Sequence, residues 1–219
     1  MTVEPTAFLY PFIDRTERDA GGLLIDMASS AAAKMADSSS LRVAMLERYA
    51  DVLASAGVAL ADRFRLGGRL FTFGNGGSAT DALATADLFR DALHGRPLSA
   101  TSLVADVAVL TALANDVGFD LVFSRQIIAH ARQHDIAIGF STSGDSLNVL
   151  RALEEAHRRQ MLTIGLCGYG GGAMWASNCL DHCLVVQSDS VHRIQEAQAA
   201  LVFALWSNVQ SALRERSLP

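Results

Sequence analysis

The sequence predicts an α/β protein built on a mostly parallel sheet with helices on both faces. From residue 69 onward, short apolar β-prone runs alternate with longer stretches of helical periodicity. The chain has 219 residues, and half are hydrophobic, which is enough to bury a sizeable core. Two loops rich in glycine and hydroxyl residues each follow an apolar run and precede a helix-like stretch. Such loops are typical of the carboxyl edge of a parallel sheet.

The first 66 residues are expected to form a helical extension, packed on a single domain that spans residues 1–219. One helix is expected over Asp14–Ala36, weakened by Gly21–Gly22. Ser38–Ser40 can cap a second helix over Leu41–Leu66, which carries an apolar stripe at helical spacing. Gly67–Gly68 is expected to end that helix. No composition shift or repeat marks a domain boundary.

The rest of the chain supplies the alternating elements. Strands are expected at Arg69–Phe73, Leu98–Val104, Ile136–Phe140, Leu162–Leu166 and Cys183–Gln187. Helices are expected at Thr80–Leu93, Asp106–Ala114, Leu121–Arg132, Leu147–Gln160 and Val191–Leu213. Because parallel strands need crossover connections, this alternation favours a parallel sheet whose ligands bind beyond the carboxyl ends of its strands.

Composition argues against several classes of protein. The net charge is −5 and there is no long basic run, so a nucleic-acid partner is disfavoured. The three cysteines, Cys167, Cys179 and Cys183, are an odd number and make no disulfide framework. Cys183 opens an apolar run, which favours a strand over a zinc site. No signal peptide is visible, and no apolar stretch reaches the roughly 20 residues of a membrane span. A cytoplasmic protein without a membrane partner is expected.

The two loops are Gly74–Ser78 and Ser141–Ser146. Backbone N–H groups, hydroxyls and the positive end of a helix all suit a phosphate group. Neither loop fits the spacing of a nucleotide P-loop or of the dinucleotide glycine motif. Two such loops in one domain suggest a ligand held at both ends, such as a sugar phosphate. The alternative for Ser141–Ser146 is a plain strand-to-helix turn capped by serine and aspartate.

The loops and their surroundings resemble the sugar isomerase (SIS) domain, and within it the bacterial phosphoheptose isomerases that act on sedoheptulose 7-phosphate. The resemblance covers roughly residues 40–215, in the family's order and with similar spacing. The matching segments are Gly74–Ser78 with Asp81, Ala114–Phe119, Phe123–Arg125, Ser141–Ser146, Asn148–Ala152, Gly168–Gly172 and Arg193–Glu196. The combination is far more specific than either loop alone.

This resemblance implies a three-layer, doubly wound, parallel five-stranded sheet in a homotetramer, with ligand sites near subunit interfaces. It implies that the phosphate is held by Ser141, Thr142, Ser143 and Ser146. It also implies that the sugar is contacted, or its pocket lined, by Asn75, Gly76, Gly77, Ser78, Asp116 and Gln195. The alternatives are an ordinary loop turn for Asp116 and a solvated helix position for Gln195.

The family's proton-transfer groups are a glutamate on the helix after the first loop and a histidine on the last helix. Some members hold zinc with these two groups, a histidine one turn before the glutamate, and the glutamine of the Arg-Ile-Gln-Glu motif. In this sequence the four positions hold Leu88, Phe203, Ala84 and Gln195. Alanine, leucine and phenylalanine neither transfer a proton nor bind a metal, so no zinc and no other cofactor is expected.

Substitute catalytic groups are His192, Glu196 and Asp87. His192 replaces the family's usual aspartate and is the best of the three, because histidine titrates near neutrality. The sequence therefore predicts a sugar-phosphate-binding SIS protein without the usual isomerase chemistry, in a regulatory or binding role that can involve a protein partner. The alternatives are an active phosphosugar aldose–ketose isomerase using a substitute such as His192, and an assembly protein with a vestigial pocket.

Overall fold

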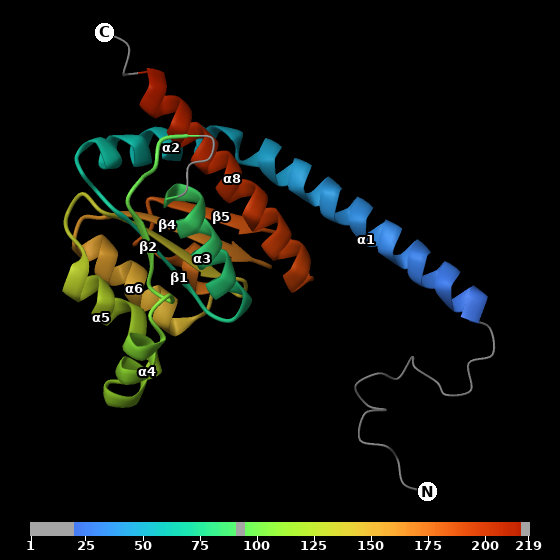
Figure 1. Ribbon diagram of the computed structural model, residues 1–219, viewed down its shortest axis with the longest axis horizontal. Coiled ribbons are helices and arrows are strands. Elements are labelled where there is room, and N and C mark those ends of the chain that lie inside the picture. The colour runs from blue at the N-terminus through green and yellow to red at the C-terminus, as the bar shows by residue number, and fades with distance from the viewer. Residues whose placement is uncertain (1–19, 91–94, 216–219) are drawn as a thin grey trace, which may run out of the picture. The chain divides into compact units, whose positions relative to one another are not determined.

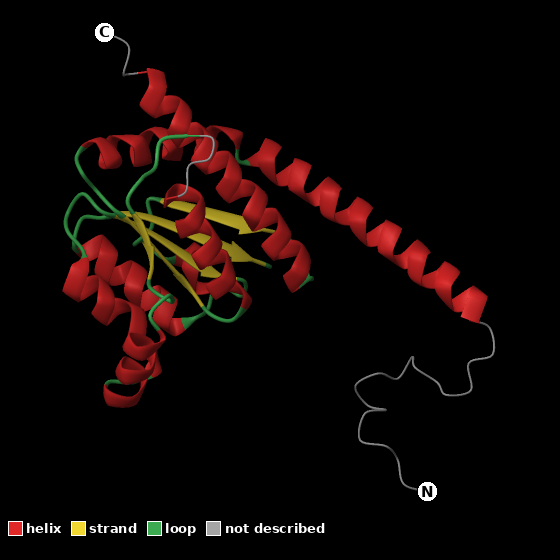
Figure 2. Cartoon of the chain, viewed as in Figure 1, coloured by secondary structure: helices red, strands yellow, loops and turns green. Residues whose placement is uncertain are grey.

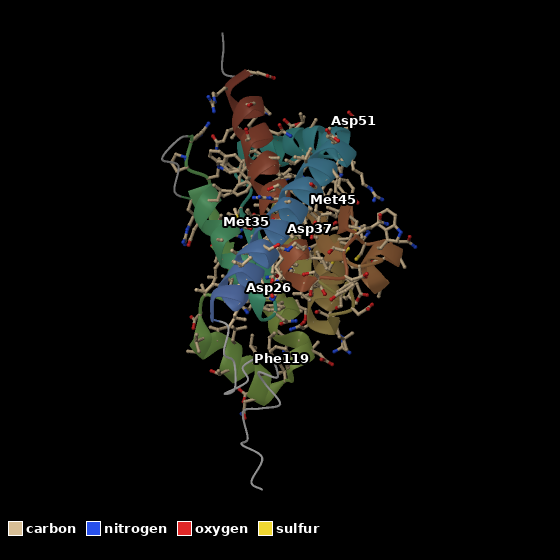
Figure 3. The ribbon with its side chains drawn as sticks, turned by 90° about the vertical axis from the view of Figure 1, so that its right-hand side faces the viewer. Asp26, Met35, Asp37, Met45, Asp51 and Phe119 are labelled. Carbon is tan, nitrogen blue, oxygen red and sulfur yellow. The ribbon has the colours of Figure 1, made fainter. Side chains whose placement is uncertain are left out.

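The computed structural model describes residues 20–90 and 95–215. The chain divides into two compact units, Met1–Ser40 and Leu41–Pro219. The described part of the first unit belongs to helix α1 (Ala20–Arg48), from which the side chains of Asp26, Met35 and Asp37 project (Figure 3). Residues 14–19 of the expected first helix lie outside the described residues.

The expected break between two N-terminal helices is in the wrong place. Ser38–Ser40 lie inside α1, and the helix ends at Arg48. Helix α2 (Ala50–Arg65) then begins after Tyr49. Serine caps a helix only where the chain leaves helical geometry, and inside a helix it costs only a few tenths of a kcal/mol relative to alanine. The end of α2 is as predicted, since Gly67 follows it with φ +79°.

The second unit contains a five-stranded, all-parallel sheet with strand order β2-β1-β3-β4-β5 (Figures 1 and 2). The predicted α/β fold is confirmed. The strands are β1 (Leu70–Gly74), β2 (Ala100–Ser102), β3 (Ile136–Ser141), β4 (Leu162–Gly168) and β5 (His182–Val186). Every residue of β1, β3 and β4 is buried, because helices cover both faces of the sheet. Strand β2 is shorter than the expected Leu98–Val104.

The helices form two layers around this sheet. One layer contains α2, α3 (Gly77–Arg90) and α8 (Val191–Glu215), and the other contains α4 (Val107–Asp116), α5 (Val122–His130) and α6 (Leu147–Arg158). The short elements η1 (Phe119–Leu121) and α7 (Gly172–Ala176) were not expected. Residues 91–93 of the expected helix Thr80–Leu93 lie outside the described residues. Across residues 20–90 and 95–215, no helix combines the length and apolarity needed to cross a bilayer.

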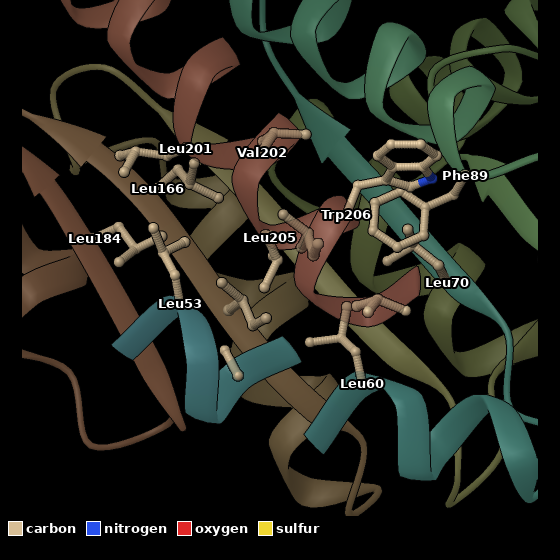
Figure 4. Close-up of a cluster of buried hydrophobic side chains, with 14 of the residues drawn as sticks. Leu53, Leu60, Leu70, Phe89, Leu166, Leu184, Leu201, Val202, Leu205 and Trp206 are labelled. Atoms are coloured by element: carbon tan, nitrogen blue, oxygen red, sulfur yellow. The ribbon is translucent and has the colours of Figure 1, made fainter. Parts of the chain in front are cut away.

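Each face of the sheet has its own apolar core. On the face covered by α2, α3 and α8, Leu60, Leu70 and Leu205 pack with Phe89 and Leu166 (Figure 4). On the opposite face the rings of Phe73 and Phe123 are 5.5 Å apart and join β1 to α5. Tight packing on both faces fixes the strand ends, and with them the loops that follow.

The strand order places a topological switch point between β1 and β3. From β1 the chain proceeds outward to β2, and from β3 it proceeds outward in the other direction to β4 and β5. In open α/β sheets, ligands bind at the carboxyl edge beside such a point. Gly74–Ser78 begins at the last residue of β1 and Ser141–Ser146 begins at the end of β3, so both loops lie at the carboxyl edge beside this switch point.

Candidate functional site

The first loop is a tight connection between β1 and α3. The Ser78 amide donates to the Asn75 carbonyl at 3.0 Å, and the Ala79 amide donates to the Gly76 carbonyl at 3.0 Å. Ser78 is buried, with 5% of its surface exposed. A Cβ on Gly77 would lie 2.5 Å from Nε2 of Gln195, so glycine at this position lets α8 approach the loop. The loop's composition therefore has a steric cause beside any ligand role.

The serine loop is organised around one hydroxyl. Ser141 Oγ lies 2.9 Å from Ser146 Oγ and 3.4 Å from Ser143 Oγ. It also accepts from the Gly144 amide at 3.1 Å. Ser141 is buried at the end of β3, whereas Ser143 is exposed and Ser146 precedes the first turn of α6. Three of the four predicted phosphate-binding hydroxyls are thus gathered at one strand end, next to a helix N-terminus.

The end of β4 and the glycine-rich segment that follows it form hydrogen bonds with the serine loop. The Gly168 amide donates to the Thr142 carbonyl at 2.9 Å, and the Met174 amide donates to the Gly144 carbonyl at 2.9 Å. The Asp145 carboxylate accepts from the Ala173 amide at 2.8 Å. Gly144 has φ +76°, and a Cβ there would lie 2.0 Å from the Gly171 carbonyl oxygen. Backbone contacts therefore hold the serine loop in a fixed shape.

Two asparagines bridge the loops across the switch point. Asn75 Nδ2 donates to Asn148 Oδ1 at 2.8 Å, and Asn148 Nδ2 donates back to Asn75 Oδ1 at 3.0 Å. Asn148 is buried in the first turn of α6. Each amide keeps a second N–H, so Asn75 can still donate to a sugar oxygen. The bridge connects the predicted sugar end of the site to the predicted phosphate end.

A second polar pair joins α3 to α8. Gln195 Nε2 donates to Asp81 Oδ2 at 2.8 Å. Burial raises the pKa of the Asp81 carboxyl above its usual 3.8, and the hydrogen bond from Gln195 partly opposes that shift. Gln195 is therefore in contact with the first loop and with α3, and it is not the solvated helix position that was the alternative.

Beside this pair lies a pocket of about 210 Å³ between α3 and α8. Among its lining residues, Asp81 supplies the ionisable group and Thr85 the hydroxyl, which donates to the Asp81 carbonyl at 2.7 Å. The remaining lining is apolar: Ala84, Leu88, Phe140, Ala199, Val202 and Phe203. Three of these, Ala84, Leu88 and Phe203, are the positions at which the resemblance implies proton-transfer and zinc-binding groups.

The side chains present do not fit a zinc ion. Zinc in proteins takes sulfur, imidazole or carboxylate ligands, usually three or four of them. The pocket lining offers one carboxylate, from Asp81, whose hydrogen-bond partner Gln195 adds one amide beside the pocket, while Ala84, Leu88 and Phe203 carry no metal-binding atom.

The predicted substitute groups lie away from the pocket lining. Asp87 is exposed on α3 and pairs with Arg90. Glu196 pairs with Arg193 at 2.5 Å. His192 is exposed in the first turn of α8. None of the three lines the pocket between α3 and α8.

Asp116 lies at the exposed end of α4, where it accepts a hydrogen bond from Asn115 Nδ2 at 2.8 Å. That contact does not connect it to either loop. Phe119, in the adjacent η1, is 57% exposed (Figure 3). The role of Asp116 as a pocket-lining residue stays a prediction.

The sequence did not predict a role for two residues that the structure places at the site. Asn148 and Asp81 were both part of the matching motifs, but neither was given a role. The signal for Asp81 was available, since it precedes Ala84 and Leu88 by three and seven residues on one helix face. The partner of Asn148 lies 73 residues away and follows only from the strand order.

The fold and the two loops define a class: α/β proteins whose glycine-rich and serine-rich loops border the switch point of a parallel sheet. Comparison with known proteins identifies the family within this class. The SIS domain family matches residues 35–168. A phosphoheptose isomerase of Campylobacter jejuni is 42% identical over 159 residues, which are 70% of this chain and 82% of that protein. The enzyme of the same name from Aquifex aeolicus is 37% identical over 183 residues, or 83% and 95% of the two chains.

Solved structures agree. A phosphoheptose isomerase structure from Neisseria gonorrhoeae matches with a TM-score of 0.78 and 34% identity, covering 84% of this chain and 99% of that one. One from Francisella tularensis matches with a TM-score of 0.78 and 30% identity, covering 84% and 98%. The chain belongs to the SIS domain family, in its phosphoheptose isomerase-like subgroup.

Proposed function

We propose that this protein binds a phosphorylated sugar at the switch point and does not perform the usual phosphoheptose isomerisation on it. The observation that carries the proposal is the contrast between the two halves of the site. The serine loop gathers hydroxyls and a helix N-terminus, which suit a phosphate group. The neighbouring pocket is lined by Ala84, Leu88 and Phe203.

Aldose–ketose isomerisation needs a base near the carbon that loses its proton and an acid near the oxygen. The apolar pocket offers neither at those three positions. Relatives named phosphoheptose isomerase support a phosphosugar as the ligand class. Binding without turnover suits a regulatory role, in which a protein partner responds to occupancy of the site.

Calorimetry with sedoheptulose 7-phosphate tests the binding half of this proposal. We expect saturable binding that falls at least about tenfold in the double variant Ser141→Ala/Ser143→Ala, because hydrogen bonds to charged groups contribute roughly 1.5–3 kcal/mol each. Ser55→Ala is the matched control, since this exposed α2 serine bonds only its own helix carbonyl at Val52. Undiminished binding by the double variant would contradict the phosphate assignment.

A second candidate function has one specific observation in its favour. Asp81 lines the pocket, and burial raises its pKa, which moves the group toward the range useful for general acid–base catalysis. An active phosphosugar isomerase would then use Asp81 rather than His192. Product formation followed by NMR distinguishes the two functions: turnover by the native chain that disappears in Asp81→Asn but survives in His192→Ala would establish the isomerase.

A further inference from the structure

The pocket between α3 and α8 has no place in simple phosphate binding. We infer that it receives an acylamino substituent of the phosphorylated sugar. This inference rests on the proposed function, because it assigns the part of the ligand that lies beyond the phosphate. The alternative occupant is an apolar side chain of a second copy of the chain, which the experiment below separates from a ligand group.

Size argues for a substituent rather than a whole ligand. The pocket's volume of about 210 Å³ corresponds to roughly seven waters at about 30 Å³ each. A heptose or hexose phosphate has more than twice that number of heavy atoms, so most of such a ligand would lie outside the pocket. A group of four heavy atoms such as acetamido fits with room to spare.

The residues that line the pocket favour a ligand group with an apolar end. Ala84, Leu88 and Val202 present only carbon to the pocket. A sugar hydroxyl placed among them would lose hydrogen bonds to water without replacement. A methyl group there would gain about fourfold in affinity from removal of its surface from water.

The polar pair formed by Asp81, which lines the pocket, and its partner Gln195 favours an amide next to the apolar end of the ligand group. In the Asp81–Gln195 pair, Gln195 Nε2 and Asp81 Oδ2 bond each other at 2.8 Å. Each side chain has one further oxygen, Oδ1 on Asp81 and Oε1 on Gln195, and both accept hydrogen bonds. An acylamino group offers the complementary N–H donor next to an apolar methyl.

The pocket lies next to the elements that carry the two loops. Phe140, which lines it, directly precedes Ser141 on β3. Asp81 lies on the helix that the first loop opens, and Gln195 touches that loop at Gly77. The inferred ligand therefore extends from the serine loop, past the Asp81–Gln195 pair, to the pocket.

The test compares two probes that differ at one carbon substituent, glucose 6-phosphate and N-acetylglucosamine 6-phosphate, by calorimetry on the full chain. We expect the acetylated probe to bind at least about fivefold more tightly. Ala84→Leu, which fills the pocket, should abolish this preference. The matched control is Ala54→Leu, the same change at an exposed α2 position, which should keep the preference.

Each other outcome overturns the inference in a distinguishable way. If both probes bind equally and both lose affinity in Ser141→Ala/Ser143→Ala, the proposed function stands and the acylamino subsite is wrong. If neither these probes nor sedoheptulose 7-phosphate binds, the proposed function fails as well. If affinities are equal and Ala84→Leu changes the sedimentation coefficient, the pocket is a contact between copies of the chain.

Discussion

Asp81 supplies the ionisable side chain of the pocket lining, so its protonation state sets the charge of the pocket. Its carboxyl is partly buried between α3 and α8, and burial raises its pKa above 3.8. The folded protein therefore holds this proton more tightly than the unfolded chain does. Stability from this group is fully present below pH 3.8 and is lost as the pH rises through the raised folded pKa.

Replacing Asp81 by asparagine should remove that loss. Asp81→Asn keeps an oxygen that accepts from Gln195 but carries no charge to bury, so we expect the variant to gain stability relative to the native chain as the pH rises from about 4 to 7. Thermal unfolding across that range measures the difference. Asp87→Asn, at an exposed position of the same helix, should show no such trend. A stability difference independent of pH would contradict the burial argument.

Asp145 places a negative charge inside the predicted phosphate loop. Its carboxylate accepts from the Ala173 amide at 2.8 Å, a bond that an asparagine oxygen can keep. Repulsion between this charge and a dianionic phosphate several ångström away in solvent is on the order of 1 kcal/mol. We expect Asp145→Asn to bind sedoheptulose 7-phosphate about three- to tenfold more tightly, with a smaller gain at high salt.

Calorimetry at two ionic strengths measures this gain. Asp120→Asn, which removes an exposed carboxylate paired with Arg151, is the control and should change affinity little. Unchanged or weaker binding by Asp145→Asn at low salt would place the phosphate elsewhere.

At the scale of single residues, the sequence predicted the gathering of serines but not their partners. Ser141, Ser143 and Ser146 are close in the chain, so their proximity follows from the loop itself. Glu196 and Asp87 are paired within their own helices with Arg193 and Arg90, one turn away. Whether such a group faces a pocket depends on the rotation of the helix against the sheet, which residue types alone do not reveal.

At the scale of elements, the bridge between Asn75 and Asn148 couples the loop after β1 to the start of α6. Both hydrogen bonds belong to one partly buried amide pair, and each contributes roughly 0.5–1.5 kcal/mol. Asn148→Ala should weaken the binding of sedoheptulose 7-phosphate about tenfold, because the groups that bind the two ends of the ligand are no longer held in fixed relative positions. Inorganic phosphate, which needs only the serine loop, should bind within about twofold of the native affinity.

Competition calorimetry with the two ligands measures this difference. Asn208→Ala is the control on α8, where the variant keeps the Cβ that packs against Gly57. An equal loss for both ligands would mean that Asn148 supports only the shape of the serine loop.

The element boundaries show what the sequence could and could not predict. Strands β1, β3, β4 and β5 begin within one residue of their predicted starts, because buried parallel strands are continuous apolar runs. The N-terminal helices were divided at Ser38–Ser40, although the helix continues to Arg48. Local capping residues do not decide whether a chain leaves the helix there. The segment η1 and helix α7 were missed, because they are too short to show a period.

At the scale of the whole molecule, the switch point between β1 and β3 explains why two loops 67 residues apart form one site. Their closeness follows from the strand order and from the register in which Gly74 lies opposite Phe140. The sequence predicted the parallel sheet, and the resemblance implied its five strands, but neither gave the order of the strands, which the structure shows. The sheet positions both loops in the same way whether or not the site is catalytic.

We also propose that the protein is a homotetramer with its sites near subunit interfaces. Sedimentation equilibrium should then give a mass of about four times the 23.3 kDa of one chain. A single monomeric species at micromolar concentration would contradict this proposal.

The central claim is that the site holds a phosphosugar without moving its protons. The most direct test incubates the protein with saturating sedoheptulose 7-phosphate in D₂O and follows the hydrogens next to the carbonyl by NMR. Proton abstraction exchanges them for deuterium even when little product accumulates. We predict ligand binding with no exchange above the rate without protein. Exchange that depends on the protein and disappears in Asp81→Asn would contradict the claim and establish an active isomerase.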